Sequence, residues 1–193
     1  MFRYIFGIMF VAVIAIAHTA QAREVAGINL AESVVLPDTD SKLVLNGAGV
    51  RSKFVFKIYV AGLYLAEKTT RVKEVLEMPG AKRVHMHFVY KEVSQEKLVK
   101  GWDRGFENNL DDATLAKLAP RLSAFNRYFA TVKKGDIINL DFKPGKGTEV
   151  WLNGTLKGSV EGDDFYRALL LVWLGEEPAD ESLKQGMLGV ESE

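Results

Sequence analysis

Alternating apolar and polar positions predict strands in three parts of this chain. Phe54, Phe56, Ile58 and Val60 are apolar at every second position, a period that is typical of a strand with one buried face. The same alternation recurs later, with Val84, Met86 and Phe88 on one face and His85 and His87 on the other, and again at Ile138, Leu140 and Phe142. Val150–Leu152 is also a candidate strand. Asn153-Gly154 directly after it favours a two-residue hairpin turn.

Between these strands, apolar residues recur at helical spacing. Leu98, Trp102, Phe106 and Leu110 repeat every four residues, and Ser94 precedes them as a candidate N-cap. Further helices are expected at Val72–Leu76, around Leu115 and Leu118, from Pro120 to Phe129, at Phe165–Trp173 and at Leu183–Leu188.

The order of these elements predicts one α+β domain. Strands are grouped early and late and helices are grouped between them, which indicates an antiparallel sheet with helices on one face. Leu43–Leu45 is a further short strand candidate, and we expect a flexible bend at Asn46–Gly49. The segment with Pro37, Asp38 and Asp40 suits a turn.

The first 22 residues have the pattern of a cleavable secretory signal. An apolar run from Phe2 to Ala17 follows Met1, carries Arg3 near its start and precedes Ala20-Gln21-Ala22, a small-x-small cleavage pattern. A retained anchor is the alternative, but the run of about 16 residues is short for a bilayer-spanning helix, which favours cleavage. We therefore expect a domain at residues 23–193, in the periplasm or secreted, with no stable membrane insertion after cleavage.

Composition excludes several classes of function. The chain has 25 basic and 25 acidic residues and no cysteine, which argues against a nucleic-acid partner and excludes disulfides and a lipidated cysteine. His85 and His87 could chelate a metal, but no cysteine or carboxylate nearby completes a set, so neither a metal nor a cofactor is expected. Pro144–Thr148 lacks the spacing of a phosphate loop, and neither Ser94 nor Ser159 lies in a nucleophile elbow.

The remaining candidate site is basic and aromatic. If the strand is regular back to Arg51, then Arg51, Lys57 and Tyr59 project from one face. An arginine fork and a phenol can hold a carboxylate or a phenolate-like oxygen by charge-assisted hydrogen bonds. A solvated basic strand face is the alternative.

Several motifs resemble the chalcone isomerase family, especially its bacterial chalcone-isomerase-like branch. They are Gly47–Arg51, Lys57–Leu65, Val93-Ser94, Lys143–Thr148, Val150–Gly154, Phe165–Gly175 with Pro178, and Leu183-Lys184, which together span nearly all of the predicted domain. The resemblance implies an open-faced β-sandwich, in which helices cover a large antiparallel sheet.

The resemblance also has implications for the site. Arg51 falls on the arginine that holds the ligand's oxygen, and Tyr59 falls where the family's fatty-acid binders have a tyrosine and the isomerases a threonine. Ser94 and Gly101 stand where the isomerases have a tyrosine and an asparagine, so both of those polar groups are absent. Gly101 and Gly105 either widen the space beside their helix or allow tight helix packing.

Three functions follow as hypotheses. The first is a non-catalytic protein that binds a small apolar carboxylate such as a fatty acid, through Arg51 and Tyr59 with Lys57 as a third candidate. The second is an isomerase (an intramolecular lyase) in the same pocket, with Tyr64 or Tyr90 as acid or base, so catalysis stays open. The third is an envelope interaction protein with a vestigial, collapsed pocket. The sequence identifies neither the ligand nor any protein partner.

Overall fold

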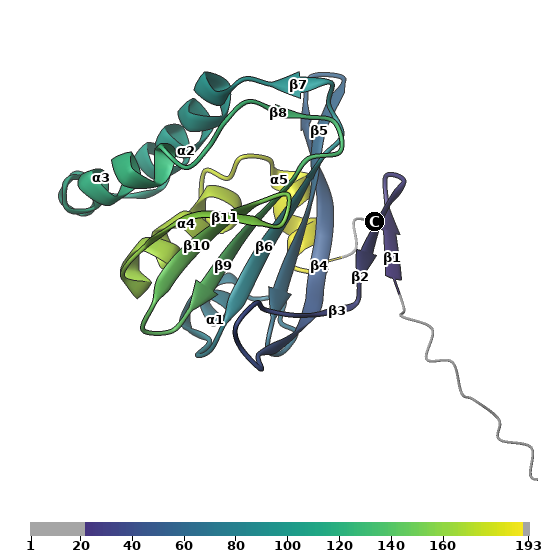
Figure 1. Cartoon of the computed structure of the whole chain (residues 1–193), viewed down its shortest axis with the longest axis horizontal. Helices are drawn as coiled ribbons and strands as arrows, with labels where there is room; N and C mark the ends of the chain where they lie inside the picture. Colours follow the sequence, from purple (N-terminus) through teal and green to yellow (C-terminus); the bar gives the residue numbers. More distant parts are fainter. Residues whose placement is uncertain (1–21, 191–193) are drawn as a thin grey trace, which may run out of the picture.

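A seven-stranded antiparallel sheet forms the centre of the computed structural model, which describes residues 22–190 (Figure 1). The predicted signal segment lies outside the described residues, except for Ala22. The strands of the sheet, from one edge to the other, are β11 (Thr155–Val160), β10 (Gly147–Leu152), β9 (Ile137–Lys143), β6 (Lys82–Phe88), β5 (Phe56–Leu65), β4 (Lys42–Lys53) and β3 (Ser33–Val35). Two small pairs flank it: β1 (Ala22–Val25) with β2 (Ile28–Ala31), and β7 (Glu92–Val93) with β8 (Val132–Lys133).

The helices pack on one face of this sheet. They are α1 (Val72–Glu77), α2 (Gln95–Asn109), α3 (Asp112–Asn126), α4 (Asp163–Leu174) and α5 (Glu181–Met187). Figure 1 shows α2 and α3 on one side of the sheet and the β1–β2 pair on the other. None of these helices within residues 22–190 is long and apolar enough to cross a bilayer.

Two hydrophobic clusters hold the layers together. The larger one joins the helices to the sheet face that carries Val84, Met86 and Phe88, which are all buried. The smaller one packs the N-terminal strands on the opposite face through Leu30, Leu36, Leu43 and other buried residues. The described residues therefore form a sheet with one hydrophobic cluster on each face.

The structure confirms the predicted fold class and several elements. The hydroxyl of Ser94 caps α2 by accepting a hydrogen bond from the backbone N–H of Lys97 at 3.4 Å. Asn153 and Gly154 have φ angles of 50° and 76°, as a two-residue hairpin turn with left-handed central residues requires. His85 and His87 lie half-buried on the sheet face opposite Val84 and Met86.

The predicted strand through Phe54 is wrong, because the chain turns there. Lys53 pairs with Phe56 across a hairpin, so Phe54 and Val55 form a two-residue turn between β4 and β5. Phe54 has a φ of 55° and is 91% exposed, so it belongs to no buried face. The alternation of apolar residues continues through this turn, and the turn lacks the usual glycine, asparagine or proline signal.

The predicted flexible bend at Asn46–Gly49 is wrong as well, since β4 continues through it as a strand with one bulge, at Asn46. Helix α5 packs directly on these residues: a Cβ atom at Gly47 would lie 2.2 Å from the carbonyl oxygen of Gly186. A Cβ atom at Gly49 would lie 3.2 Å from the Cα of Leu183. These glycines therefore serve close helix–strand packing rather than a turn.

Helix α3 is one helix, where the sequence predicts two. Pro120 lies inside it, exposed to solvent, although proline removes one helical hydrogen bond. Leu118, Leu122 and Phe125 are buried on both sides of Pro120, so packing onto the core outweighs that loss.

Candidate functional site

Arg51 and Tyr59 face each other across two strands. They are direct partners in the register of β4 and β5, so their side chains project from the same sheet face. The hairpin, rather than one regular strand, brings them together. Both side chains line a cavity between the sheet and α2.

A tryptophan positions the phenol of Tyr59. The Nε1–H of Trp173, on α4, donates a hydrogen bond to the phenol oxygen at 3.0 Å, and Phe88 packs against the tyrosine ring. Burial raises the pKa of Tyr59, against the opposing effects of the Arg51 charge and of the hydrogen bond from Trp173. The phenol is therefore neutral at physiological pH, and its own O–H remains available as a donor.

The segment before α5 holds Arg51 in place. Nη1 of Arg51 donates a hydrogen bond to the carbonyl oxygen of Ala179 at 2.9 Å. Asp180 accepts from the backbone N–H of Ser52 at 2.9 Å and also caps α5. Burial raises the pKa of Asp180, but the hydrogen bonds from Ser52, Leu183 and Ser182 and the Arg51 charge outweigh it and lower the pKa. Among residues 22–190, the other N–H groups of Arg51 have no protein acceptor.

The cavity has a volume of about 660 Å³, within the range of roughly 300–1,000 Å³ that small-molecule sites occupy. Its walls are largely apolar and include Ile58, Met86, Phe88, Leu98 and Val172. The buried Nε1–H of Trp102, another lining residue, finds no acceptor among the described residues. The arrangement offers polar donors beside an apolar volume, which suits an amphiphilic anion.

The two glycines of α2 differ in their surroundings. A Cβ atom at Gly101 would meet nothing within 4 Å, so this position opens onto the cavity that it lines. A Cβ atom at Gly105 would lie 2.7 Å from Cγ2 of Val172, so Gly105 lets α2 approach α4 closely. Of the two roles expected from the sequence, Gly101 widens the space beside the helix and Gly105 allows tight helix packing.

Lys57 does not line this cavity. The register of β4 and β5 shifts between Arg51 and Ser52, so that Ile58 is an extra residue in β5. A bulge of this kind re-aims the neighbouring side chains. Phe56, Ile58 and Tyr59 all line the cavity, whereas Lys57 is exposed outside it. The structure therefore gives Lys57 no support as a head-group ligand.

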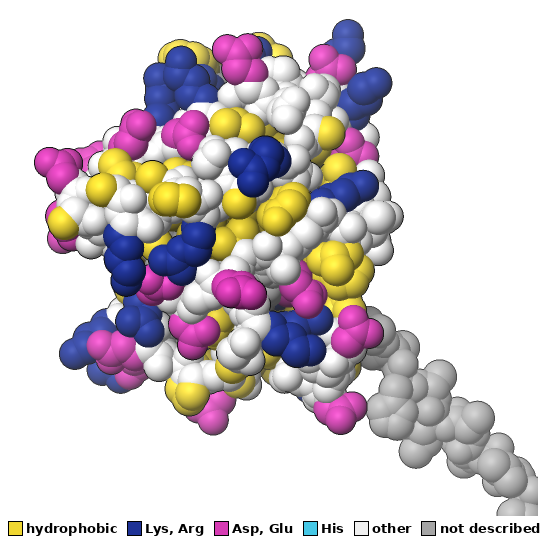
Figure 2. All heavy atoms as spheres, turned by 60° about the vertical axis from the view of Figure 1, so that its left-hand side comes forward, with side chains coloured by type: hydrophobic (Ala, Val, Ile, Leu, Met, Phe, Trp, Pro, Cys, Tyr) yellow, Lys and Arg dark blue, Asp and Glu magenta, His cyan; other side chains and the backbone are white. Residues whose placement is uncertain are grey.

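Exposed cations on α2 surround the cavity, and the sequence reasoning missed them. Lys97, Lys100 and Arg104 line it together with Arg51 and Lys53, whereas Glu92 and Glu177 are its acidic lining residues. Lys97, Lys100 and Arg104 are spaced by three and four residues along α2. This spacing places them on one helix face, and the sequence could have revealed it. Figure 2 shows Lys and Arg side chains beside hydrophobic and some acidic ones at the top of the molecule, where Figure 1 places β7 and the β4–β5 turn.

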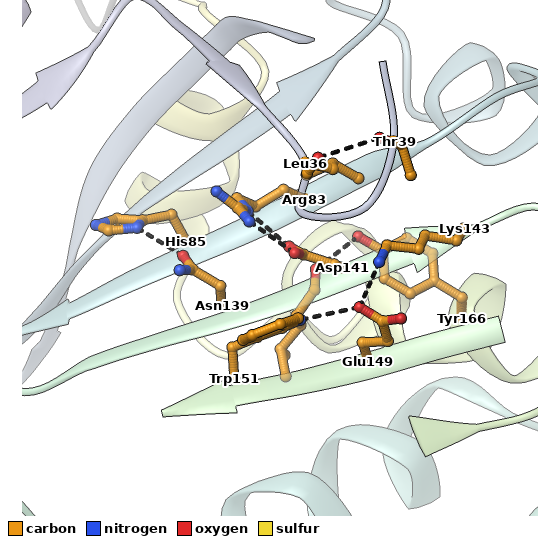
Figure 3. Close-up of polar contacts among 11 residues, drawn as sticks. Leu36, Thr39, Arg83, His85, Asn139, Asp141, Lys143, Glu149, Trp151 and Tyr166 are labelled. Carbon is orange, nitrogen blue, oxygen red and sulfur yellow. Dashed lines mark hydrogen bonds and ion pairs between the residues drawn. The ribbon is translucent and has the colours of Figure 1, made fainter. Parts of the chain in front are cut away.

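A second polar cluster lies on β6, β9 and β10, away from the cavity (Figure 3). Arg83 makes two hydrogen bonds of 2.6 Å to the fully buried Asp141, and Nδ1 of His85 lies 2.8 Å from the side-chain oxygen of Asn139. The buried Lys143 forms an ion pair with Glu149 at 2.7 Å. Residues 22–190 contain no group of three or more potential metal ligands. Each of these side chains has a partner within the cluster, although Nζ of Lys143 makes only its ion pair and no hydrogen bond, so we assign the cluster a structural role.

Tyr64 and Tyr90, the candidate acids or bases, lie in different places. Tyr64 is buried on the opposite sheet face, where its hydroxyl donates to the carbonyl oxygen of Ala31 at 3.0 Å. Tyr90 lines the cavity, and its ring contacts Phe56 edge to face. The pocket therefore brings together Arg51, Tyr59 and Tyr90, but not Tyr64.

Comparison with known proteins agrees with this architecture. A family model described as chalcone isomerase-like matches residues 22–189. A solved structure of a fatty-acid binding protein from Arabidopsis thaliana superposes with a TM-score of 0.60 at 20% sequence identity, and the alignment covers 81% of this chain and 96% of that one. At this identity the likeness shows the fold. No curated protein sequence matches the chain significantly.

Proposed function

Because this chain belongs to the chalcone isomerase-like family, we propose that it uses the family's pocket to bind a small apolar carboxylate, such as a fatty acid. The observation that carries the proposal is the pairing of Arg51 with Tyr59 on the cavity wall. The fatty-acid binding protein with the same fold adds support.

The head group would bind at the two paired side chains. Arg51 is charged, held at one nitrogen by Ala179, and has other N–H groups to offer a carboxylate. Tyr59 is neutral. The hydrogen bond from Trp173 uses a lone pair of the phenol oxygen, and no residue within 22–190 accepts the phenol hydrogen, so its O–H is free to donate. Charge-assisted hydrogen bonds from two preorganised donors fix the position of the head group.

The apolar remainder would lie along the sheet face toward α2. Met86, Phe88, Leu98 and Val172 supply apolar contacts, and the open space at Gly101 gives room for a chain. The third hypothesis predicts a collapsed pocket, whereas the cavity of about 660 Å³ favours a ligand.

Two side chains that isomerase chemistry would need are absent at the matched positions. The hydroxyl of Ser94 is used to cap α2, and Gly101 offers no side chain. The developing negative charge of an enolate requires preorganised donors beyond the arginine. We therefore propose a binding protein rather than an enzyme. Turnover of a chalcone that is lost in Arg51→Ala would contradict this choice.

Native mass spectrometry with lipid extraction tests the proposal directly. We expect the purified protein to carry, or to take up when oleate is added, one carboxylate ligand, and expect Arg51→Ala to lose it. A protein that stays free of ligand when oleate is added would refute the proposal.

We also propose that the protein works outside the cytoplasm, in the periplasm or secreted. The basis is the N-terminal sequence: an apolar run that ends at Ala20-Gln21-Ala22. The intact mass of the protein recovered from cells should correspond to a chain that begins at Arg23. Recovery of the uncleaved chain in the membrane fraction would favour the anchor instead.

A further inference from the structure

The tip of the β4–β5 hairpin, Lys53–Lys57, presents apolar side chains to solvent. Phe54 is 91% exposed, Val55 87% and Phe56 53%. Isolated exposed apolar residues are ordinary, but three consecutive ones at the end of a projecting hairpin form a contact surface. Nothing within residues 22–190 covers Phe54 and Val55, and Tyr90 partly covers Phe56.

The backbone of this tip is strained at Phe54, which carries a bulky aromatic side chain. Phe54 has a φ of 55° in a two-residue turn, a position that glycine or asparagine normally takes. A bulky side chain in the left-handed region carries an energetic cost. The side chain of Phe54 gains nothing from packing that would offset this cost, since it is almost fully exposed. The strain at Phe54 therefore has no compensating contact within residues 22–190.

Charge indicates the chemistry of the surface that the tip contacts. Lys53 and Lys57 flank the three apolar residues directly, and both are exposed. Lys97, Lys100 and Arg104 on α2 lie around the same cavity and add positive charge, although the whole chain has 25 basic and 25 acidic residues. Apolar side chains can insert into a bilayer while the flanking lysines stay at the level of the head groups. This arrangement matches the interface of an anionic bilayer.

The tip is also continuous with the cavity. Phe54 and Phe56 belong to the cavity lining, and the ring of Phe56 contacts that of Tyr90 with centroids 5.6 Å apart. A surface held against the tip therefore lies at the mouth of the cavity. An amphiphile could pass between the surface and the cavity without crossing water.

We propose that the hairpin tip docks on a bilayer with anionic head groups, inserting Phe54, Val55 and Phe56 while Lys53 and Lys57 contact the head groups. The docking itself does not depend on the proposed function. Its role as the passage for a carboxylate ligand rests on that function.

Vesicle flotation tests the docking. The protein is the chain from Arg23 onward, the form expected after cleavage of the signal, because the apolar run at residues 2–17 would itself bind lipid. The vesicles are phosphatidylcholine alone or phosphatidylcholine with about one third phosphatidylglycerol, both free of fatty acid. We expect binding to the anionic vesicles that weakens with salt, and much weaker binding to neutral ones.

The test variants change the tip without threatening the fold. Phe54→Asn keeps a residue that tolerates a positive φ, and with Val55→Ser it should reduce binding by about tenfold or more. Lys53→Glu with Lys57→Glu should reduce binding to anionic vesicles by at least about tenfold and leave neutral vesicles unaffected. Circular dichroism checks that each variant is folded.

The far end of β4 offers a matched control. Val35 is 59% exposed and pairs with Lys42, the first residue of β4, which lies about 35 Å along the strand from Lys53. Val35→Ser with Lys42→Glu makes the same kinds of change there and should not alter binding.

Arg51→Ala separates the two proposals, since it should abolish ligand retention and still bind vesicles. Wild-type protein that fails to float with anionic vesicles, or a tip variant that floats as well as wild type, would overturn the docking proposal. Concentration-dependent dimerisation by sedimentation velocity that disappears in Phe54→Asn/Val55→Ser, without vesicle binding, would assign the tip to a second copy instead.

Discussion

The indole N–H of Trp173 donates to the phenol oxygen of Tyr59 at 3.0 Å, which leaves the hydrogen of the phenol for another acceptor. The two residues are separated by more than a hundred positions in the chain, and both are buried. This contact determines which part of the tyrosine can serve a ligand.

Tyr59→Phe should therefore weaken ligand binding by about tenfold or more, because the ligand's carboxylate loses a hydrogen-bond donor. The measurement is a titration with oleate followed by intrinsic or probe fluorescence. Tyr64→Phe is the matched control: it removes a hydroxyl with one hydrogen bond, to Ala31, on the other sheet face. Equal losses of affinity in the two variants would place the head group elsewhere.

Arg51→Lys should lower ligand affinity by about tenfold or more although the charge is kept, because an ammonium cannot replace the fork geometry of the guanidinium. Arg51→Ala should lower it further. Arg127→Lys, at an exposed arginine beyond the end of α3, serves as the control and should bind as wild type. Full binding by Arg51→Lys would mean that charge alone holds the carboxylate.

The two glycines of α2 should respond oppositely to alanine. Gly101→Ala should raise the free energy of unfolding by about 0.5–1 kcal/mol, because alanine favours the helix and the Cβ meets no neighbour. Gly105→Ala should lower it, because the Cβ would lie 2.7 Å from Val172. Urea denaturation measures both.

Filling the space at Gly101 tests the cavity itself. Gly101→Leu should reduce oleate binding while the protein remains folded, because the side chain enters the volume assigned to the ligand. Undiminished binding by this variant would show that the chain of the ligand lies elsewhere.

Asp141→Asn should destabilise the protein by up to about 3–5 kcal/mol, because it leaves the largely buried Arg83 without its charge partner, while burial, which raises the pKa of Asp141, offsets part of the pair's contribution. Urea denaturation again gives the difference. Glu74→Gln, in the exposed pair of Glu74 with Arg71, should change stability little. Similar effects of the two substitutions would show that the buried pair is no more important than a surface one.

Stability should fall as the pH is lowered through the range in which histidine titrates. Burial lowers the pKa of His85 and of His87, against a raising effect of Asn139 on His85. The unfolded chain, with histidine pKa near 6.5, then binds more protons than the folded one just below that pH, so protonation favours unfolding.

Urea denaturation at about pH 7.5 and about pH 5.5 measures this effect. The variant His85→Gln with His87→Gln should lose less stability between these two values than wild type does. An equal loss in both proteins would assign the pH dependence to other groups.

The sequence predicted elements whose signals are local. The turn at Asn153-Gly154 and the cap at Ser94 depend on residues within a few positions of one another, and both were predicted correctly. The turn at Phe54-Val55 was missed, because its apolar side chains carry a strand pattern and no turn signal. The bend expected at Gly47 and Gly49 was wrong because their role is to admit α5, which comes from the other end of the chain.

By itself, the sequence determined the α+β class through its short-range periodicity, and its resemblance to the family singled out Arg51 and Tyr59. Only the tertiary structure decided that a hairpin sets these two opposite each other, that a bulge turns Lys57 away, and that Trp173 and Ala179 complete their surroundings. The physical reason is that strand register and helix packing depend on contacts between distant segments. Those contacts form only when the whole core is buried.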